Sequence, residues 1–257
     1  PGLKEAGRKL NMDRFLYDIF HELEDKHWWF VARREIITDC IRKYPAQTRV
    51  PKILDIGCGT GLILKHLQQF GRVQGIDCSS EAVEYTNMRI AGGAVAKLGS
   101  LPNQIPFDNE KFNVITLLDV LEHIDNDQES IEVVYSLLEK GGVLICTVPA
   151  YQFLWSNHDN INHHKRRYTL TELRNKLVSA GFKIEKISHY NTILFPFIAG
   201  IRILKHLFRI NAYKIDFQLP PKGVNDFLKS LFAFEKYLLR GINLPFGVSL
   251  LASARKP

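Results

Sequence analysis

Residues 52–61 read Lys-Ile-Leu-Asp-Ile-Gly-Cys-Gly-Thr-Gly, and a segment with the apolar spacing of a helix begins at Leu62. A short apolar strand that ends in a glycine-rich turn and opens into a helix is typical of an α/β fold that binds a nucleotide-like ligand. Glycine is needed there because a Cβ would block the close approach of a ligand or forbid the turn. The dinucleotide version of this loop, Gly-x-Gly-x-x-Gly, requires glycine at position 62. Leucine at that position argues against a nicotinamide cofactor.

Short apolar runs alternate with helical segments along the rest of the chain. Strands are expected at 52–56, 73–77, 94–98, 112–118, 143–148, 182–189 and 248–254. Helices are expected at 12–24, 29–43, 62–70, 81–90, 128–138 (ended by the glycines at 141 and 142), 169–180, 197–209 and 224–239. This alternation predicts a doubly wound α/β sheet in one domain, 1–257, with a helical segment at 12–48 and a helical insertion at 193–243 before the last strand.

The composition limits the class of protein and its partners. The 257 residues are 46% hydrophobic and 24% charged, which is ordinary for a globular protein. A net charge of +7 favours an anionic partner: nucleic acid, a phosphorylated small molecule or an acidic membrane surface. The four cysteines are scattered, which argues against disulfides or a zinc site and for a reducing compartment. Neither a signal peptide nor a membrane span is visible, so we expect a cytoplasmic protein.

A second feature of the ligand site is Asp77, which ends the second predicted strand, 20 residues beyond Gly57. An acidic side chain there can accept hydrogen bonds from both ribose hydroxyls of a nucleoside. The glycine loop and Asp77 follow adjacent strands, and open α/β sheets bind ligands at the carboxyl ends of their strands. The two features together therefore predict one nucleoside site.

Four ordered motifs resemble those of class I S-adenosylmethionine (SAM)-dependent methyltransferases: residues 53–61, Gly-Ile-Asp at 75–77, Asp-Val-Leu-Glu-His at 119–123 and Leu-Glu-Lys-Gly-Gly-Val-Leu at 138–144. The resemblance covers about residues 50–190. It implies SAM as cofactor and a seven-stranded Rossmann-like sheet, mostly parallel with an antiparallel last strand, with helices on both faces. Many relatives carry aspartate at the adenine-binding position, where this chain has Ser100. The cofactor-binding residues that it implies are Asp55, Gly57, Cys58, Gly59, Gly61, Asp77, Cys78, Ser100, Leu101, Asp119, Val120 and Trp28.

Motifs in the N-terminal region and after the fifth strand point to one subgroup of these methyltransferases. His-Trp-Trp-Phe at 27–30, with Trp155 and the segments around 158 and 164–168, is similar to a bacterial methyltransferase subgroup of type 11 or 12 that often belongs to glycan and lipid-linked sugar pathways. An aromatic cluster before the first strand can close over SAM as a lid that excludes water. It can also be an ordinary core-packing helix. Trp28 and Trp29 are adjacent, so they cannot both face the same side of a helix.

The loop after the fifth strand is expected to recognise the acceptor. Residues 149–168 hold three histidines and three consecutive cations. An oxygen acceptor must lose its proton, and histidine is the usual base near neutral pH. The catalytic candidates are His158, His164 and His123, and the substrate-binding candidates are Tyr151, Trp155, Arg166, Arg167 and Tyr168. Two alternatives stay open: a metal site, which we do not predict because the spacing matches no familiar site, and a solvated basic loop whose histidines pair with Asp159.

The insertion carries most of the positive charge, since residues 193–240 hold eight Lys and Arg against three acids. Between 197 and 209 the apolar residues Phe197, Ile201, Leu204, Leu207 and Phe208 oppose Arg202, Lys205, His206 and Arg209. A basic amphipathic helix suits contact with a membrane surface at its inner face. The other interpretation is that the helices pack on the sheet or form a dimer surface.

These patterns favour an enzyme that transfers a methyl group from SAM to a small-molecule or lipid- or glycan-linked acceptor, at oxygen. A nucleic-acid or protein methyltransferase is the alternative, together with a non-catalytic SAM-binding or peripheral-membrane module. Nucleic acid is not the expected partner, because Asp-Val-Leu-Glu at 119–122 stands where base-flipping enzymes carry an Asn-Pro-Pro-Tyr-type stacking pocket. The oligomeric state is left open.

Overall fold

The structure is a computed structural model that describes residues 17–44, 48–90, 95–107, 109–208 and 218–257. Seven strands form one sheet in the order β3-β2-β1-β4-β5-β7-β6. Only β7 is antiparallel to its neighbours, β5 and β6, which confirms the predicted fold class. The strands are β1 (Lys52–Ile56), β2 (Arg72–Asp77), β3 (Ala96–Leu98), β4 (Phe112–Leu118), β5 (Leu138–Pro149), β6 (Lys183–Tyr190) and β7 (Ser249–Arg255).

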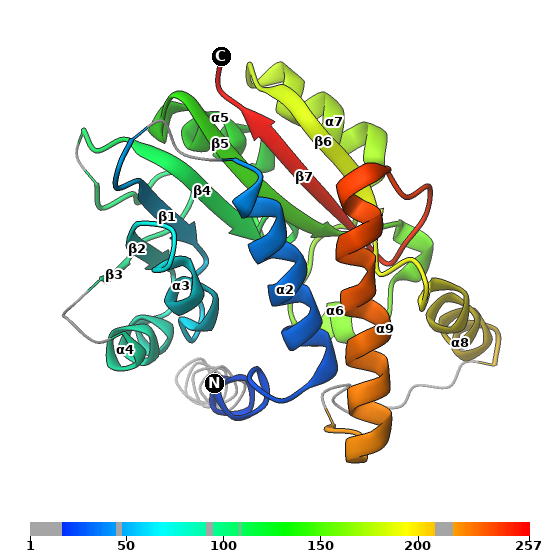
Figure 1. Ribbon diagram of the computed structural model, residues 1–257. Coiled ribbons are helices and arrows are strands. Elements are labelled where there is room, and N and C mark those ends of the chain that lie inside the picture. Colours follow the sequence, from blue (N-terminus) through cyan, green and yellow to red (C-terminus); the bar gives the residue numbers. More distant parts are fainter. Residues whose placement is uncertain (1–16, 45–47, 91–94, 108, 209–217) are drawn as a thin grey trace, which may run out of the picture.

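Helices cover both faces of the sheet (Figure 1). One face carries α2 (Trp28–Arg42), α3 (Leu62–Leu67), α4 (Ser80–Arg89) and α9 (Lys222–Gly241), and the other carries α5 (Asp127–Leu137) and α7 (Leu170–Ser179). Neighbouring residues of the central strands point to opposite cores, as a strand requires: Val114 packs under α2 and Ile115 under α5. The strand expected at 112–118 is confirmed as β4, and it is buried on both faces, as is typical of a strand inside a parallel sheet.

The largest differences from the predicted boundaries are at β5 and α3. The helix expected at 128–138 ends at Leu137, but the strand expected from 143 already begins at Leu138, so the glycines 141 and 142 lie inside β5 and do not end the helix. The β4–β5 pairing shifts register between Phe112 and Val114, which accommodates the early start of β5. The helix after the glycine loop is also shorter, because α3 ends at Leu67 instead of Phe70.

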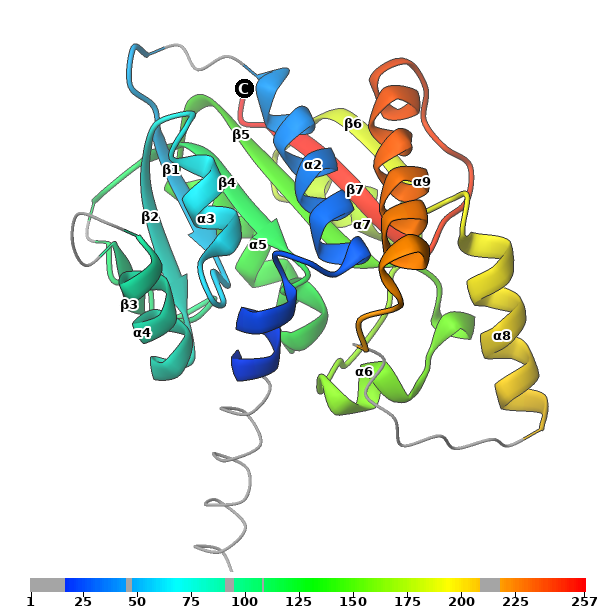
Figure 2. The same ribbon diagram turned by 60° about the horizontal axis from the view of Figure 1, so that its bottom comes forward.

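The inserted segment forms two helices with different environments. α9 lies beside α2 in both ribbon views (Figures 1 and 2), and the side chain of Phe232 is fully buried between them and the sheet. A Lys236–Glu35 ion pair of 2.6 Å joins the two helices. α8 (Phe195–Leu207) lies at the edge of the molecule, and Arg209 falls outside the described residues. Among the described residues, no helix is long and apolar enough to cross a bilayer.

Candidate active site

A cavity of about 1310 Å³ lies at the carboxyl edge of the parallel strands. That is more than the roughly 300–1,000 Å³ of a single small-molecule site, so there is room for two ligands side by side. The predicted site residues that line it are Trp28, Asp55, Gly57, Cys58, Gly59, Asp77, Cys78, Ser100, Leu101, Asp119, Val120, His123, Trp155, His158, His164 and Arg167. Predicted cofactor and acceptor residues thus meet in one space.

The glycine loop is held against β2 by the carboxylate of Asp77. Its Oδ2 accepts the Gly59 N–H at 2.9 Å, and its Oδ1 accepts the Ser79 N–H at 3.0 Å. Gly59 has a φ of +54°, and nothing lies within 4 Å of the position that a Cβ would occupy. The loop therefore presents bare backbone to the cavity at this point, as close approach of a ligand requires.

Gly61 has a structural role instead, since it does not line the cavity. Its φ is +80°, and a Cβ there would lie 2.8 Å from Cα of Thr86 on α4. The missing side chain allows α3 and α4 to pack closely behind the loop. Position 61 thus needs glycine for packing, although the sequence pattern assigned it to cofactor binding.

We expect Gly61→Ala to lower the free energy of unfolding by at least about 2 kcal/mol, because a left-handed alanine costs about 1–2 kcal/mol before the clash with Thr86 is counted. A thermal melt would show this as a loss of about 4 °C or more. Gly200→Ala is the matched control, since Gly200 lies in α8 with open space around its Cβ position. An unchanged melting temperature for Gly61→Ala would contradict the packing role.

Asp55 occupies the buried floor of the cavity, where its Oδ1 accepts the Thr116 hydroxyl at 2.6 Å. Burial raises the pKa of Asp55 to about 7, against the opposing effects of Thr116 and of the Arg33 charge. Asp119, after β4, forms an ion pair of 2.5 Å with Arg33 of α2, and its Oδ1 accepts the Thr147 hydroxyl at 3.2 Å. Arg33 therefore fixes a predicted cofactor residue from a helix far away in the sequence.

The N-terminal segment closes one wall of the cavity. The buried Glu24 accepts the Thr60 hydroxyl of the glycine loop at 2.5 Å and forms an ion pair of 2.5 Å with Arg89 of α4. Trp28 is tied to α9, because its backbone N–H donates to Oδ1 of Asn225 at 2.9 Å. Trp29 also lines the cavity and lies under the Arg33 guanidinium. Trp29 belongs to the aromatic cluster at 27–30 that we expected as a lid, whereas no sequence pattern pointed to Glu24 or Thr60.

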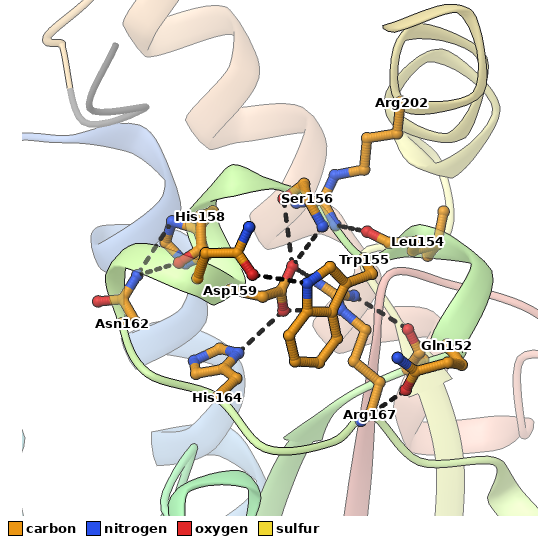
Figure 3. A network of polar contacts seen from close by, with 12 residues as sticks. Gln152, Leu154, Trp155, Ser156, His158, Asp159, Asn162, His164, Arg167 and Arg202 are labelled. Atoms are coloured by element: carbon orange, nitrogen blue, oxygen red, sulfur yellow. Dashed lines mark hydrogen bonds and ion pairs between the residues drawn. The ribbon is translucent and has the colours of Figure 1, made fainter. Parts of the chain in front are cut away.

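Residues 149–168, which we expected to recognise the acceptor, form one end of the cavity, called the acceptor end below. The fully buried Asp159 joins several of their side chains there (Figure 3). Asp159 lies in α6 (Asn157–Ile161). Its Oδ1 is 2.9 Å from Nδ1 of His164, and Arg167 donates to its two oxygens from Nε at 2.8 Å and Nη2 at 3.0 Å. Burial opposes the charge of Asp159, but the hydrogen bonds from His164 and Arg167 outweigh it and hold the pKa of this carboxyl well below its usual range. An ionised Asp159 makes Nδ1 of His164 the donor and leaves Nε2 as the basic nitrogen.

Two more titratable side chains lie beside His164. The ring of His123 stands at 4.7 Å from that of His164, centroid to centroid, and burial lowers the pKa of His123 to about 4. Glu122 is fully buried, and neither of its carboxyl oxygens has a hydrogen-bond partner among the described residues. Burial raises the pKa of Glu122 well above its usual range, and the charge of Asp119 raises it further. Ligand atoms of these three residues lie within 4.8 Å of one another and could hold a metal ion, although the sequence pointed to no metal site.

Several residues that we expected to bind the acceptor contact other protein side chains. Arg167 lines the cavity, and its guanidinium donates to both carboxylate oxygens of Asp159 and to the carbonyl of Ala150. The Tyr168 side chain is buried and donates its hydroxyl to Asp127 at 2.8 Å, and Arg166 forms an ion pair of 3.1 Å with the same carboxylate. Tyr151 stacks on His189. None of Arg166, Tyr168 and Tyr151 lines the described cavity.

The comparison with known families agrees with this geometry. A family model described as a methyltransferase domain matches residues 27–187. The chain belongs to this methyltransferase family. The family is SAM-dependent, and the cavity brings together the residues that we expected to bind the cofactor: the carboxylate of Asp77, the exposed backbone of Gly59, and Asp119.

Curated relatives are similar over part of the chain. The ubiquinone biosynthesis O-methyltransferase of Glaesserella parasuis is 33% identical over 101 residues, which cover 36% of this chain and 43% of the relative. That of Chromobacterium violaceum is 25% identical over 182 residues, covering 62% of this chain and 68% of the relative. The chain thus spans less than half the length of the first of these relatives.

Solved structures share the fold at low sequence identity. A SAM-dependent methyltransferase from Mesorhizobium loti is similar with a TM-score of 0.55 at 16% identity, covering 84% of this chain and 95% of the other. The phosphoethanolamine N-methyltransferase 2 of Haemonchus contortus, in complex with SAM, has a TM-score of 0.54 at 18% identity, covering 84% and 51%. At these identities the likeness concerns the fold alone.

Proposed function

We propose that this methyltransferase methylates an oxygen of a small-molecule or lipid- or glycan-linked acceptor, with His164 as the general base. The observation that carries the proposal is the Asp159–His164 contact of 2.9 Å beside the cavity that both His164 and the glycine loop line. Relatives named for O-methylation in ubiquinone biosynthesis support an oxygen acceptor. A cytoplasmic location at the inner face of the membrane, with contact through residues 193–240, belongs to the same proposal.

The chemistry follows from the geometry of this end of the cavity. When bound, SAM supplies a methyl group that is already activated for attack, so alignment and deprotonation of the acceptor are what the protein must add. Asp159 fixes the tautomer of His164, and Nε2 then accepts the proton that the acceptor oxygen loses. His123 is a poorer base, because a pKa of about 4 leaves it weakly basic. His158 already has a local contact, since its Nδ1 lies 3.3 Å from the amide of Asn162.

Transfer of a labelled methyl group from SAM into fractionated cell extract tests the function. We expect label in a small-molecule or organic-phase fraction, and mass spectrometry of the labelled product should place the methyl group on oxygen. Label confined to the nucleic-acid or protein fraction would contradict the proposal. Label in a small molecule, but on nitrogen, would overturn the oxygen assignment and leave the substrate class standing.

A further inference from the structure

The exposed side of α8 is apolar. Phe197 is 71% exposed, Ile201 54% and Leu204 53%, and Phe208, next to the end of the helix, is 70% exposed. Their spacing of four, three and four residues aligns them along one side of the helix. We call these four residues the α8 stripe. An amphipathic helix normally turns such a side toward the core, but here the side that faces inward carries the buried Ala199 and the half-buried Ile198.

Cations flank the α8 stripe. Nη1 of Arg202 donates to the carbonyl of Leu154 at 2.7 Å, which anchors the helix to the loop after β5 (Figure 3). Lys205 is exposed, one helical turn from Ile201. No acidic residue occurs in α8. Arg202 is half-buried and engaged by Leu154, so it is the exposed Lys205 that places a positive charge beside the apolar stripe, as suits anionic head groups over hydrocarbon.

The α8 stripe borders the active-site cavity. Ile198, Ile201, Arg202 and Lys205 line the cavity, so Ile201 belongs both to its wall and to the exposed stripe. Figure 2 shows α8 at the same end of the molecule as α6, which carries Asp159. A surface that covers the α8 stripe therefore also meets the rim of the cavity on the acceptor side.

We propose that the α8 stripe docks on an anionic phospholipid bilayer. An exposed apolar row with an adjacent cation and no acid in the helix is typical of helices that lie in the membrane interface. A second copy of this chain could also cover the apolar side chains, but anionic head groups complement Lys205, and α8 itself offers no acid that would. The docking gives a defined surface and lipid class to the membrane contact that is part of the proposed function. The idea that docking also admits an acceptor from the lipid phase rests on that function.

Vesicle binding, measured without SAM or acceptor, tests the docking separately from catalysis. Vesicles of phosphatidylcholine with phosphatidylglycerol should sediment the full chain, and vesicles of phosphatidylcholine alone should sediment much less. The double variant Phe197→Glu/Leu204→Glu should bind anionic vesicles at least about tenfold more weakly, because two apolar side chains are replaced by anions. Val178→Glu is the matched control, since Val178 is 52% exposed on α7.

Two results of the vesicle experiment would contradict the docking proposal. Equal binding by the double variant and by wild type would remove the α8 stripe from the contact. Failure of the wild-type chain to bind anionic vesicles would exclude the bilayer as the occupant. If light scattering then showed a dimer that the double variant dissociates, the occupant would be a second copy. Melting temperature and SAM affinity, both expected to be unchanged, verify that the double variant is folded.

Discussion

His164→Ala is expected to lower kcat for methyl transfer by about 100- to 10,000-fold, the range in which general bases contribute, with SAM affinity nearly unchanged. The imidazole is held by Asp159 at 2.9 Å and lines the acceptor end of the cavity. Its loss removes the proton acceptor and leaves the glycine loop intact. Single-turnover rates at saturating SAM, with the acceptor fraction identified from extract, provide the measurement.

His163→Ala is the matched control for this prediction. His163 neighbours His164 in the sequence, but it is exposed and does not line the cavity. This control variant should therefore keep wild-type turnover. Full activity of His164→Ala would show that His164 is not the base.

Asp159→Asn separates the orientation of His164 from its presence. Asparagine has nearly the same shape but no charge, so it would no longer favour the tautomer with the proton on Nδ1 and would leave Arg167 without its anion. We expect a fall in kcat that resembles that of His164→Ala in direction, together with a lower melting temperature. A pH profile of kcat that shifts in Asp159→Asn but not in His163→Ala would support the positioning role, whereas a purely structural role would change stability alone.

The cofactor half of the site could be predicted from the sequence because its contacts are local or follow from strand order. Gly59 and Asp77 are 18 residues apart, and β1 and β2 are neighbours in the sheet, so the strand–loop pattern already brings them together. What the pattern did not distinguish is a glycine that faces the ligand from one that faces protein. Gly61 belongs to the second kind only because Thr86 of α4 packs against it.

For the acceptor half of the site, the sequence predicted the segment that contributes but not the contacts of its individual side chains. Lys165, Arg166 and Arg167 are similar in sequence, but each has a different acid: Asp125, Asp127 and Asp159. Two of these acids lie about 40 residues away, so tertiary packing decides which cation stays available to a ligand. The same holds for Arg33, whose ion pair with Asp119 joins α2 to the end of β4. Likewise, the amphipathic pattern located α8 but did not say which of its sides would face the sheet.

Asp77→Ala is expected to weaken SAM binding by about 10- to 100-fold, since hydrogen bonds to a charged group contribute about 1.5–3 kcal/mol. Its carboxylate accepts the Gly59 and Ser79 N–H groups, and burial raises the pKa of this carboxyl from its usual value while those bonds stabilise the charge. These bonds hold the carboxylate at the end of β2, where we expect the ribose of SAM to bind. Calorimetric titration with SAM is the measurement.

A ribose role for Asp77 predicts more than a loss of SAM affinity in the Asp77→Ala variant. S-adenosylhomocysteine has the same ribose, so its affinity should fall by the same factor, while kcat at saturating SAM stays near the wild-type value. Asp125→Ala is the control, because Asp125 also lines the cavity, but its side chain is 78% exposed and pairs with Lys165. An Asp77→Ala variant that binds both ligands like wild type would refute the ribose role. Weakened SAM binding with S-adenosylhomocysteine unaffected would place Asp77 at the methyl-sulfonium centre instead of at the ribose.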